Sequence, residues 1–298
     1  MIILDTNPHA WHLLADTVSL STAVSNLCVF INAHIAFNHT NKVAVIASHT
    51  KRACFLYPPS LTSTTGTTTQ NGFSEDVEMA DTANGTDTES DANTYRPFRQ
   101  VREALLSSLK ALFDSTTPDS LSVTTSMAGA LSLALTYINK QNILASSAIP
   151  TNTTGAPDPS ADTVPVLLTS RMLILSVSGD LAHQYIPMMN TIFACQRLSI
   201  PIDIAKIAGD TVFLQQASDA TKGTFMQLEH PRGLLQYLMM GFLPDATSRQ
   251  HLISPTQVGV DFRAACFCHR KIVDMGYVCS ICLSSKSPLL RVTFDEYI

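Results

Sequence analysis

Basic residues are missing from a long stretch of this 298-residue chain, between Arg52 and Arg96. The same stretch holds seven acidic residues, Glu75, Asp76, Glu78, Asp81, Asp87, Glu89 and Asp91. The formal charge of the chain is −5, so the remainder carries about +2, from −5 plus 7. A nearly neutral folded part is a poor electrostatic match for a phosphate backbone. We therefore expect a protein partner and no strong direct binding of nucleic acid.

A secretory signal and a long apolar run are missing as well. Residues 1–5 already have the pattern of a strand, without a basic region, a longer apolar stretch and a cleavage site. No uninterrupted apolar run approaches the roughly 20 residues that cross a bilayer. The sequence predicts an intracellular protein with no membrane partner.

Common enzyme motifs are also missing from the sequence. It has no Gly-x-x-x-x-Gly-Lys phosphate loop, no Gly-x-Gly-x-x-Gly, no Gly-x-Ser-x-Gly and no His-Glu-x-x-His. Cys28, Cys54 and Cys195 lie in apolar patterns, which is more typical of small core residues than of nucleophiles. These observations favour a chain that is not an enzyme.

The sequence does contain a regular alternation of strand and helix patterns. Strands are predicted near residues 2–5, 42–48, 52–58, 171–178, 200–207 and 223–228, and helices near 17–37, 96–113, 122–140, 181–198, 211–219 and 231–243. The run from Met172 to Val177 is almost wholly apolar, as in strands that are buried on both faces of a parallel sheet. We expect a doubly wound, mostly parallel α/β sheet of the Rossmann type over residues 1–245.

Two segments of low complexity interrupt this alternation, at about residues 60–94 and 145–163. They are rich in Thr, Ser, Asn, Gly and Asp and have few large apolar side chains. Such segments cannot bury enough apolar surface to offset the entropy of ordering. We expect both to be disordered insertions.

The triplet Asp5-Thr6-Asn7 follows the first predicted strand and has three interpretations. The first is a metal-dependent nuclease of the PIN type using Asp5 and Asp180, which needs several carboxylates around Mg²⁺ or Mn²⁺. The second is a degraded metal site of the von Willebrand factor A type, in which Asn7 and His9 stand where serines are expected. The third, which we favour, is that the Asp5 side chain accepts hydrogen bonds from backbone amides. We therefore expect no Mg²⁺ at Asp5.

Four cysteines crowd into the last part of the chain, at Cys266, Cys268, Cys279 and Cys282. In a reducing compartment, such a cluster suggests a metal rather than disulfides. Two close pairs can present four thiolates to one structural Zn²⁺. The metal would supply much of the folding free energy of so short a segment. We expect a zinc-binding tail over residues 260–298, in which His269 could replace one cysteine.

The tail also carries a specific resemblance. Asp261-Phe-Arg-Ala-Ala-Cys-Phe-Cys-His-Arg, with Gly276-Tyr-Val-Cys-Ser-Ile-Cys, closely resembles the 34-kilodalton subunits of the general transcription and DNA-repair factor TFIIH. Phe213-Leu-Gln-Gln-Ala and Leu234-Leu-Gln-Tyr-Leu resemble the same family. The chain departs from the family after Cys282, where Leu283-Ser-Ser-Lys-Ser-Pro replaces further cysteines, so the zinc finger is expected to be incomplete.

This resemblance implies a von Willebrand factor A-like domain without a working metal site, followed by a C4-type zinc finger. It further implies a non-catalytic scaffold in the nucleus, bound to the 44-kilodalton TFIIH subunit that carries a RING-type module and to other subunits of the TFIIH core. The complex opens DNA in RNA polymerase II transcription initiation and in nucleotide excision repair, and its helicase subunits do the catalysis. For the docking surface, we expect the loops at the strand ends, including Asn7 to Trp11.

Overall fold

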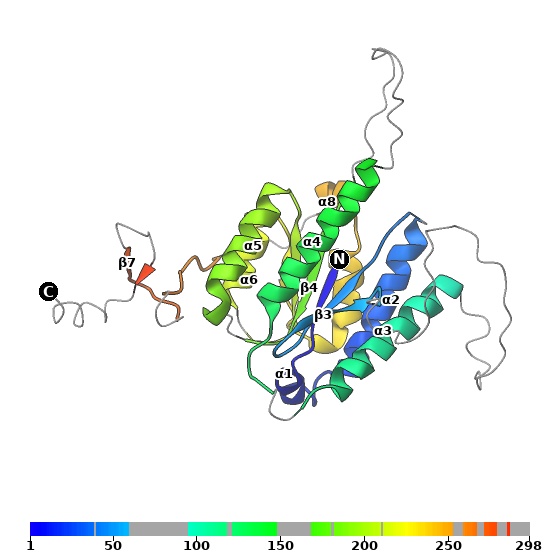
Figure 1. Ribbon diagram of the computed structural model, residues 1–298, viewed down its shortest axis with the longest axis horizontal. Helices are drawn as coiled ribbons and strands as arrows, with labels where there is room; N and C mark the ends of the chain where they lie inside the picture. Colours follow the sequence, from blue (N-terminus) through cyan, green and yellow to red (C-terminus); the bar gives the residue numbers. More distant parts are fainter. Residues whose placement is uncertain are drawn as a thin grey trace, which may run out of the picture.

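A six-stranded sheet lies at the centre of the molecule (Figure 1). The computed structural model describes residues 1–38, 40–59, 95–117, 121–147, 168–179, 182–209, 211–252, 259–266, 271–278 and 285–286. The strands of the sheet are β1 (Ile2–Asp5), β2 (Val45–Ser48), β3 (Ala53–Tyr57), β4 (Met172–Ser176), β5 (Ile202–Lys206) and β6 (Phe225–Gln227). Their order is β3-β2-β1-β4-β5-β6, and only the edge strand β3 runs antiparallel to its neighbour. The prediction of a doubly wound, mostly parallel sheet is confirmed.

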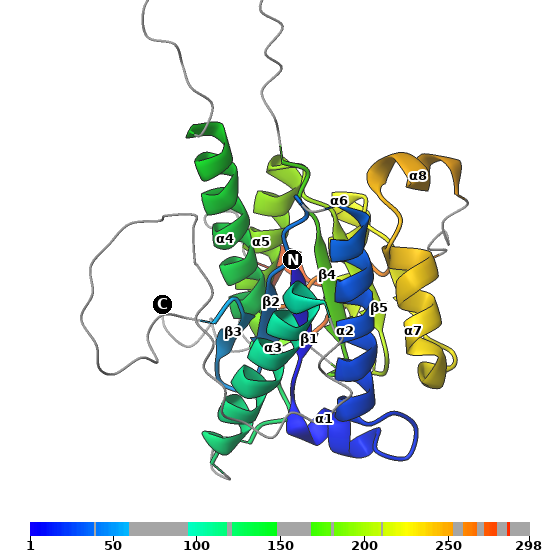
Figure 2. The same cartoon turned by 90° about the vertical axis from the view of Figure 1, so that its right-hand side faces the viewer.

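Helices cover both faces of the sheet (Figures 1 and 2). One face packs against α2 (Leu20–Phe37), α3 (Arg96–Asp114), α7 (Leu234–Tyr237) and the π-helical turn η5 (Leu238–Phe242). The other packs against α4 (Met127–Ser147), α5 (Tyr185–Arg197) and α6 (Val212–Thr221). Ile2 and Leu4 of β1 belong to the first core cluster and Ile3 to the second. Because side chains alternate along a strand, a strand buried on both faces is apolar throughout.

Helix α2 is long and apolar enough to cross a membrane, by length and composition alone. Core helices of globular domains meet these criteria as well. Ala23, Leu27 and Ile31 are fully buried and recur every fourth residue, so they form one face toward the sheet. Packing against the sheet accounts for the apolar character of α2.

The structure differs from the sequence predictions at several helices. The helix expected at residues 231–243 is divided into the 3-10 turn η4 (Pro231–Gly233), α7 and η5. Helix α4 continues to Ser147, although an insertion was expected from residue 145. Two short helices, α1 (Pro8–Leu13) and α8 (Ala246–His251), were not predicted, because six residues give too little periodicity to recognise. Residues 60–94 and 148–163 lie outside the described residues.

The beginning of the cysteine-rich tail contacts the α/β domain. Gln216 of α6 donates through Nε2 to the carbonyl oxygens of Asp261 at 2.7 Å and Arg263 at 3.2 Å. Ala265 is fully buried in the same core cluster as α5 and α6, and it forms an antiparallel bridge with Ile272. Further on, β7 (Tyr277–Val278) and β8 (Ser285–Lys286) pair with each other. The tail therefore begins as a segment packed on the domain.

Candidate functional site

The polar side chains of greatest interest lie where the parallel strands end. β1 and β4 are parallel neighbours at which the strand order of the sheet reverses, and ligands of doubly wound folds bind outside the carboxyl ends of the strands at such a point. Asp5 ends β1, Ser176 ends β4 and Lys206 ends β5. We call Asp5, Ser176, Ser178 and Lys206 the carboxyl-edge cluster. All four are buried, with exposed fractions of 3% or less.

The Asp5 carboxylate accepts three backbone hydrogen bonds. Oδ2 accepts from the amides of Val177 at 3.1 Å and Ser178 at 2.8 Å, and Oδ1 accepts from the amide of Asn7 at 3.2 Å. Two of these donors follow β4, which is more than 170 residues away in sequence. The side chain therefore fastens the loop after β4 to the end of β1, as the third interpretation of Asp5-Thr6-Asn7 predicted.

Asn7 is also part of the internal structure. Its Oδ1 accepts from the amide of His9 at 3.1 Å and caps helix α1, while its Nδ2 donates to the carbonyl of Val123 at 2.7 Å. Trp11 donates from Nε1 to the carbonyl of Asp5 at 2.8 Å. The Asn7 and Trp11 side chains are buried, whereas His9 between them is exposed, so these two side chains are not available to a partner and the docking surface stays a prediction. Their hydrogen bonds fix the loop to the sheet.

Lys206 was not singled out by the sequence analysis. Its ammonium donates to Ser176 Oγ at 2.9 Å and to the carbonyl oxygen of Ser178. The pairing register of β4 and β5 places Ser176 directly opposite Lys206. The sequence did contain one indication of this buried lysine. Lys206 interrupts an otherwise apolar run from Ile204 to Ile207, and such a run is typical of a strand that is buried on both faces of a sheet.

His49 joins the ends of β1 and β2 to helix α3. Its Nδ1 lies 3.0 Å from the carbonyl oxygen of Thr6 and 3.1 Å from Thr6 Oγ1, and its Nε2 lies 3.0 Å from Thr116 Oγ1. A carbonyl oxygen only accepts, so Nδ1 carries a proton. Burial lowers the pKa of His49, with a smaller opposing effect from its hydrogen bond to Thr6. The fold therefore favours the neutral ring.

We expect stability to fall as the pH drops below about 6.5, the ordinary pKa of histidine. Burial lowers the pKa of His34 to about 4, with help from the Arg171 charge, and that of His49 shifts in the same direction. The unfolded chain then binds protons more tightly than the folded one, so stability is lost as the pH falls from about 6.5 toward the folded-state pKa of His34, about 4. Thermal unfolding at pH 7 and pH 5 measures this loss. His34→Gln should reduce it, whereas His12→Gln, at an exposed position, should not; an equal loss in both variants would contradict the assignment.

The metal ligands predicted from the sequence can be placed only in part. Cys266 is buried, and its amide donates to the carbonyl of Lys271 at 2.9 Å. Cys268, Cys279 and Cys282 lie outside the described residues, as does Asp180 of the nuclease alternative. Within the described ranges, no three His, Cys, Asp or Glu side chains gather in a way that could hold a metal ion. Of the two residues of the nuclease alternative, the described part of the chain contains only Asp5, and zinc in the tail stays a prediction.

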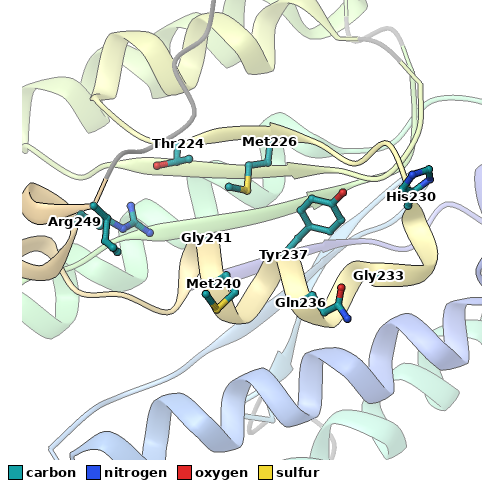
Figure 3. A pocket seen from close by; sticks show the side chains of 10 residues that line it. Thr224, Met226, His230, Gly233, Gln236, Tyr237, Met240, Gly241 and Arg249 are labelled. Carbon is teal, nitrogen blue, oxygen red and sulfur yellow. The ribbon is translucent and has the colours of Figure 1, made fainter.

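A separate cavity of about 420 Å³ lies between β6 and the helical segment that follows it (Figure 3). Met226 from β6 and Tyr237 from α7 project into it from opposite sides, and Arg249 of α8 lies at one end. The lining is mainly apolar, and it includes no member of the carboxyl-edge cluster. The cavity is therefore distinct from the polar site at the strand ends.

Known proteins resemble this chain over nearly its whole length. The family described as Transcription factor Tfb4 matches residues 1–289. The "General transcription and DNA repair factor IIH subunit tfb4" of Schizosaccharomyces pombe is 44% identical over 285 residues, which cover 95% of this chain and 82% of that protein. The TFB4 subunit of Saccharomyces cerevisiae is 32% identical, with 100% of this chain and 86% of that protein covered. The crystal structure of the TFIIH p34 N-terminal domain matches with a TM-score of 0.61 and 41% identity, covering 81% of this chain and 95% of the other. The chain therefore belongs to the transcription factor Tfb4 family.

Proposed function

We propose that this protein is a non-catalytic subunit of the TFIIH core, acting in RNA polymerase II transcription initiation and nucleotide excision repair. Its relatives carry the name of a general transcription and DNA repair factor subunit, which implies work in the nucleus. The observation that carries the non-catalytic part is the Asp5 carboxylate, whose two oxygens accept three backbone amides. A carboxylate used in this way holds two loops together and is not presented to a substrate.

The partner we propose is the 44-kilodalton TFIIH subunit with the RING-type module, and other core subunits would complete the assembly. Three apolar side chains at the carboxyl end of the sheet offer a surface for it: Leu13 is 72% exposed, Leu121 is 53% and Val123 is 67%. The hydrogen bond from Asn7 to the carbonyl of Val123 joins the loop before α4 to the base of α1. We propose that these exposed apolar side chains contribute to the surface that binds the partner.

Co-purification of the full chain with the tagged 44-kilodalton subunit tests this proposal. We expect the two chains in equal amounts. The double variant Leu13→Asp, Val123→Asp should weaken binding by about tenfold or more, since it charges the apolar surface. Met240→Asp, at a residue that is 79% exposed beside the distant cavity, is the matched control. Failure of the unaltered chain to co-purify would refute the partner, and loss of binding in Met240→Asp alone would refute the surface.

We further propose that the tail binds one structural Zn²⁺ through Cys266, Cys268, Cys279 and Cys282. The burial of Cys266 and the bridge between Ala265 and Ile272 support an ordered start to this segment. Metal analysis of the purified pair should give about one zinc per chain beyond the zinc of the companion. Cys279→Ser should lose that zinc while the pair persists. No additional zinc in the unaltered chain would refute the metal site.

A further inference from the structure

A buried lysine contacts the loop that follows β4, which is the same loop that Asp5 holds. Lys206 is 1% exposed and is among the largest fully buried side chains of the described residues. Burying an ammonium is expensive unless acceptors surround it. Ser176 Oγ and the Ser178 carbonyl are two such acceptors, and both belong to β4 and the loop that follows it. Hydrogen bonds to β4 and its following loop therefore hold the ammonium in a fixed position.

One anionic and one cationic side chain, Asp5 and Lys206, bind the same short loop after β4. The amide of Ser178 donates to Asp5 Oδ2 at 2.8 Å, and the carbonyl of Ser178 accepts from Lys206 Nζ. Asp5 thus holds the loop by its donors, while Lys206 holds it by an acceptor. A divalent ion held by Asp5 would likewise supply positive charge beside this loop.

The residues present do not suit a divalent cation. Mg²⁺ requires about six oxygen ligands in near-octahedral geometry. The three backbone amides use three of the about four acceptor positions of the Asp5 carboxylate, and Asn7 engages its own side-chain oxygen with the amide of His9, so these two side chains offer few oxygen ligands. Ser178 Oγ is buried without a hydrogen-bond partner in the described part of the chain, but it is a single neutral oxygen. The Lys206 charge would also repel an incoming cation.

We propose that the ammonium of Lys206 is the resident cation of this domain, and that it fixes the loop from Ser176 to Gly179 in place of a divalent metal ion. The loop geometry at the carboxyl edge is then permanent and independent of the Mg²⁺ concentration. Lys206 acts as a positioning residue for the loop and not as a catalytic group. This inference does not depend on the partner proposed above.

Metal binding by the unaltered full chain is the first test. The protein is dialysed without chelator, so that the tail keeps any zinc, and is then titrated with Mn²⁺ by electron paramagnetic resonance. A site with a Kd of about 0.1 mM would change the unfolding equilibrium by about 100-fold in 10 mM Mg²⁺. We expect no such change in thermal unfolding. A Mn²⁺ site or a Mg²⁺-dependent stabilisation that Asp5→Asn removes would overturn the proposal.

Removal of the ammonium is the second test. Lys206→Met retains much of the apolar length of the side chain but lacks the charge, so we expect it to shift the unfolding equilibrium by at least about tenfold. Hydrogen exchange of the Val177 and Ser178 amides should accelerate more than that of amides inside β5, because the effect on the loop is local. Lys140→Met, at an exposed position of α4, is the matched control. A stable Lys206→Met with unchanged exchange at both amides would overturn the proposal.

If Lys206→Met does not fold, the less disruptive variant Ser176→Ala provides the test. Ser176→Ala removes one acceptor of the ammonium and leaves the lysine in place. We expect a smaller loss of stability with the same local acceleration of exchange at Val177 and Ser178. A variant that matches the unaltered protein in both measurements would overturn the proposal, since the ammonium would then not hold the loop through Ser176.

Discussion

Asp5→Ala is expected to lower the free energy of unfolding by about 3–5 kcal/mol, because three buried backbone amides lose a charged acceptor together. Each buried donor left without an acceptor costs about 1–3 kcal/mol. Removal of the carboxylate also detaches the loop after β4 from the end of β1, so we expect a larger loss of stability than from one broken hydrogen bond. Chemical denaturation of the purified chain, followed by circular dichroism, measures it.

Two further variants separate the role of the carboxylate from a general effect of substitution. Asp5→Asn retains one acceptor oxygen and should lose less stability than Asp5→Ala. Asp16→Ala, at an exposed position after α1, should change the free energy of unfolding by less than about 0.5 kcal/mol. Equal stability of Asp5→Ala and Asp16→Ala would show that the carboxylate does not hold the two loops together.

The sheet could be predicted from the sequence because its four central strands, β1, β2, β4 and β5, are buried on both faces. Met172 to Val177 is an almost uninterrupted apolar run, and all five residues of β4 are buried. The structural role of Asp5 could also be predicted from the sequence. Few other carboxylates follow the later strands, so a metal site was not expected and backbone amides were the expected partners of Asp5. The residues that supply those amides, Val177 and Ser178, could not be identified, because they lie about 170 positions away.

Other features depend on tertiary contacts that no local pattern contains. The helix predicted at residues 231–243 changes to a π-helical turn over Leu238–Phe242, which contains Gly241, where an added Cβ would lie 2.7 Å from the Met226 sulfur of β6. Lys206 lies in an apolar run that indicates a buried strand, but only the pairing with β4 shows which groups accept from its ammonium. Such positions are set by partners distant in sequence.

Arg249→Met is expected to destabilise the protein by about 3–5 kcal/mol, because it leaves a buried carboxylate without its closest cation. Asp203 lies in β5 with its side chain 1% exposed, and it accepts from Arg249 Nη1 at 2.8 Å and Nη2 at 2.7 Å. The amide of Thr224 donates to the same carboxylate at 3.0 Å, and Arg171 lies 4.0 Å away. A two-point arginine–carboxylate pair of this kind is far stronger than an exposed ion pair.

The pair also fastens α8 to the sheet, and this gives the prediction a local consequence. Arg249 lies in α8 and lines the cavity together with Met226 and Tyr237. Arg249→Met should therefore accelerate hydrogen exchange of the α8 amides more than that of amides elsewhere in the domain. Arg99→Met breaks an exposed pair with Glu103 at 3.4 Å and should cost no more than about 0.5 kcal/mol.

A double-mutant cycle decides whether the pair itself carries the effect. The double variant Asp203→Leu, Arg249→Met removes both charges, so it should be less destabilised than the sum of the two single variants by at least about 1 kcal/mol. Additive losses would mean that the two side chains stabilise the protein independently. In that event the packing of the Arg249 side chain, and not its pairing with Asp203, would be what holds α8 against β5.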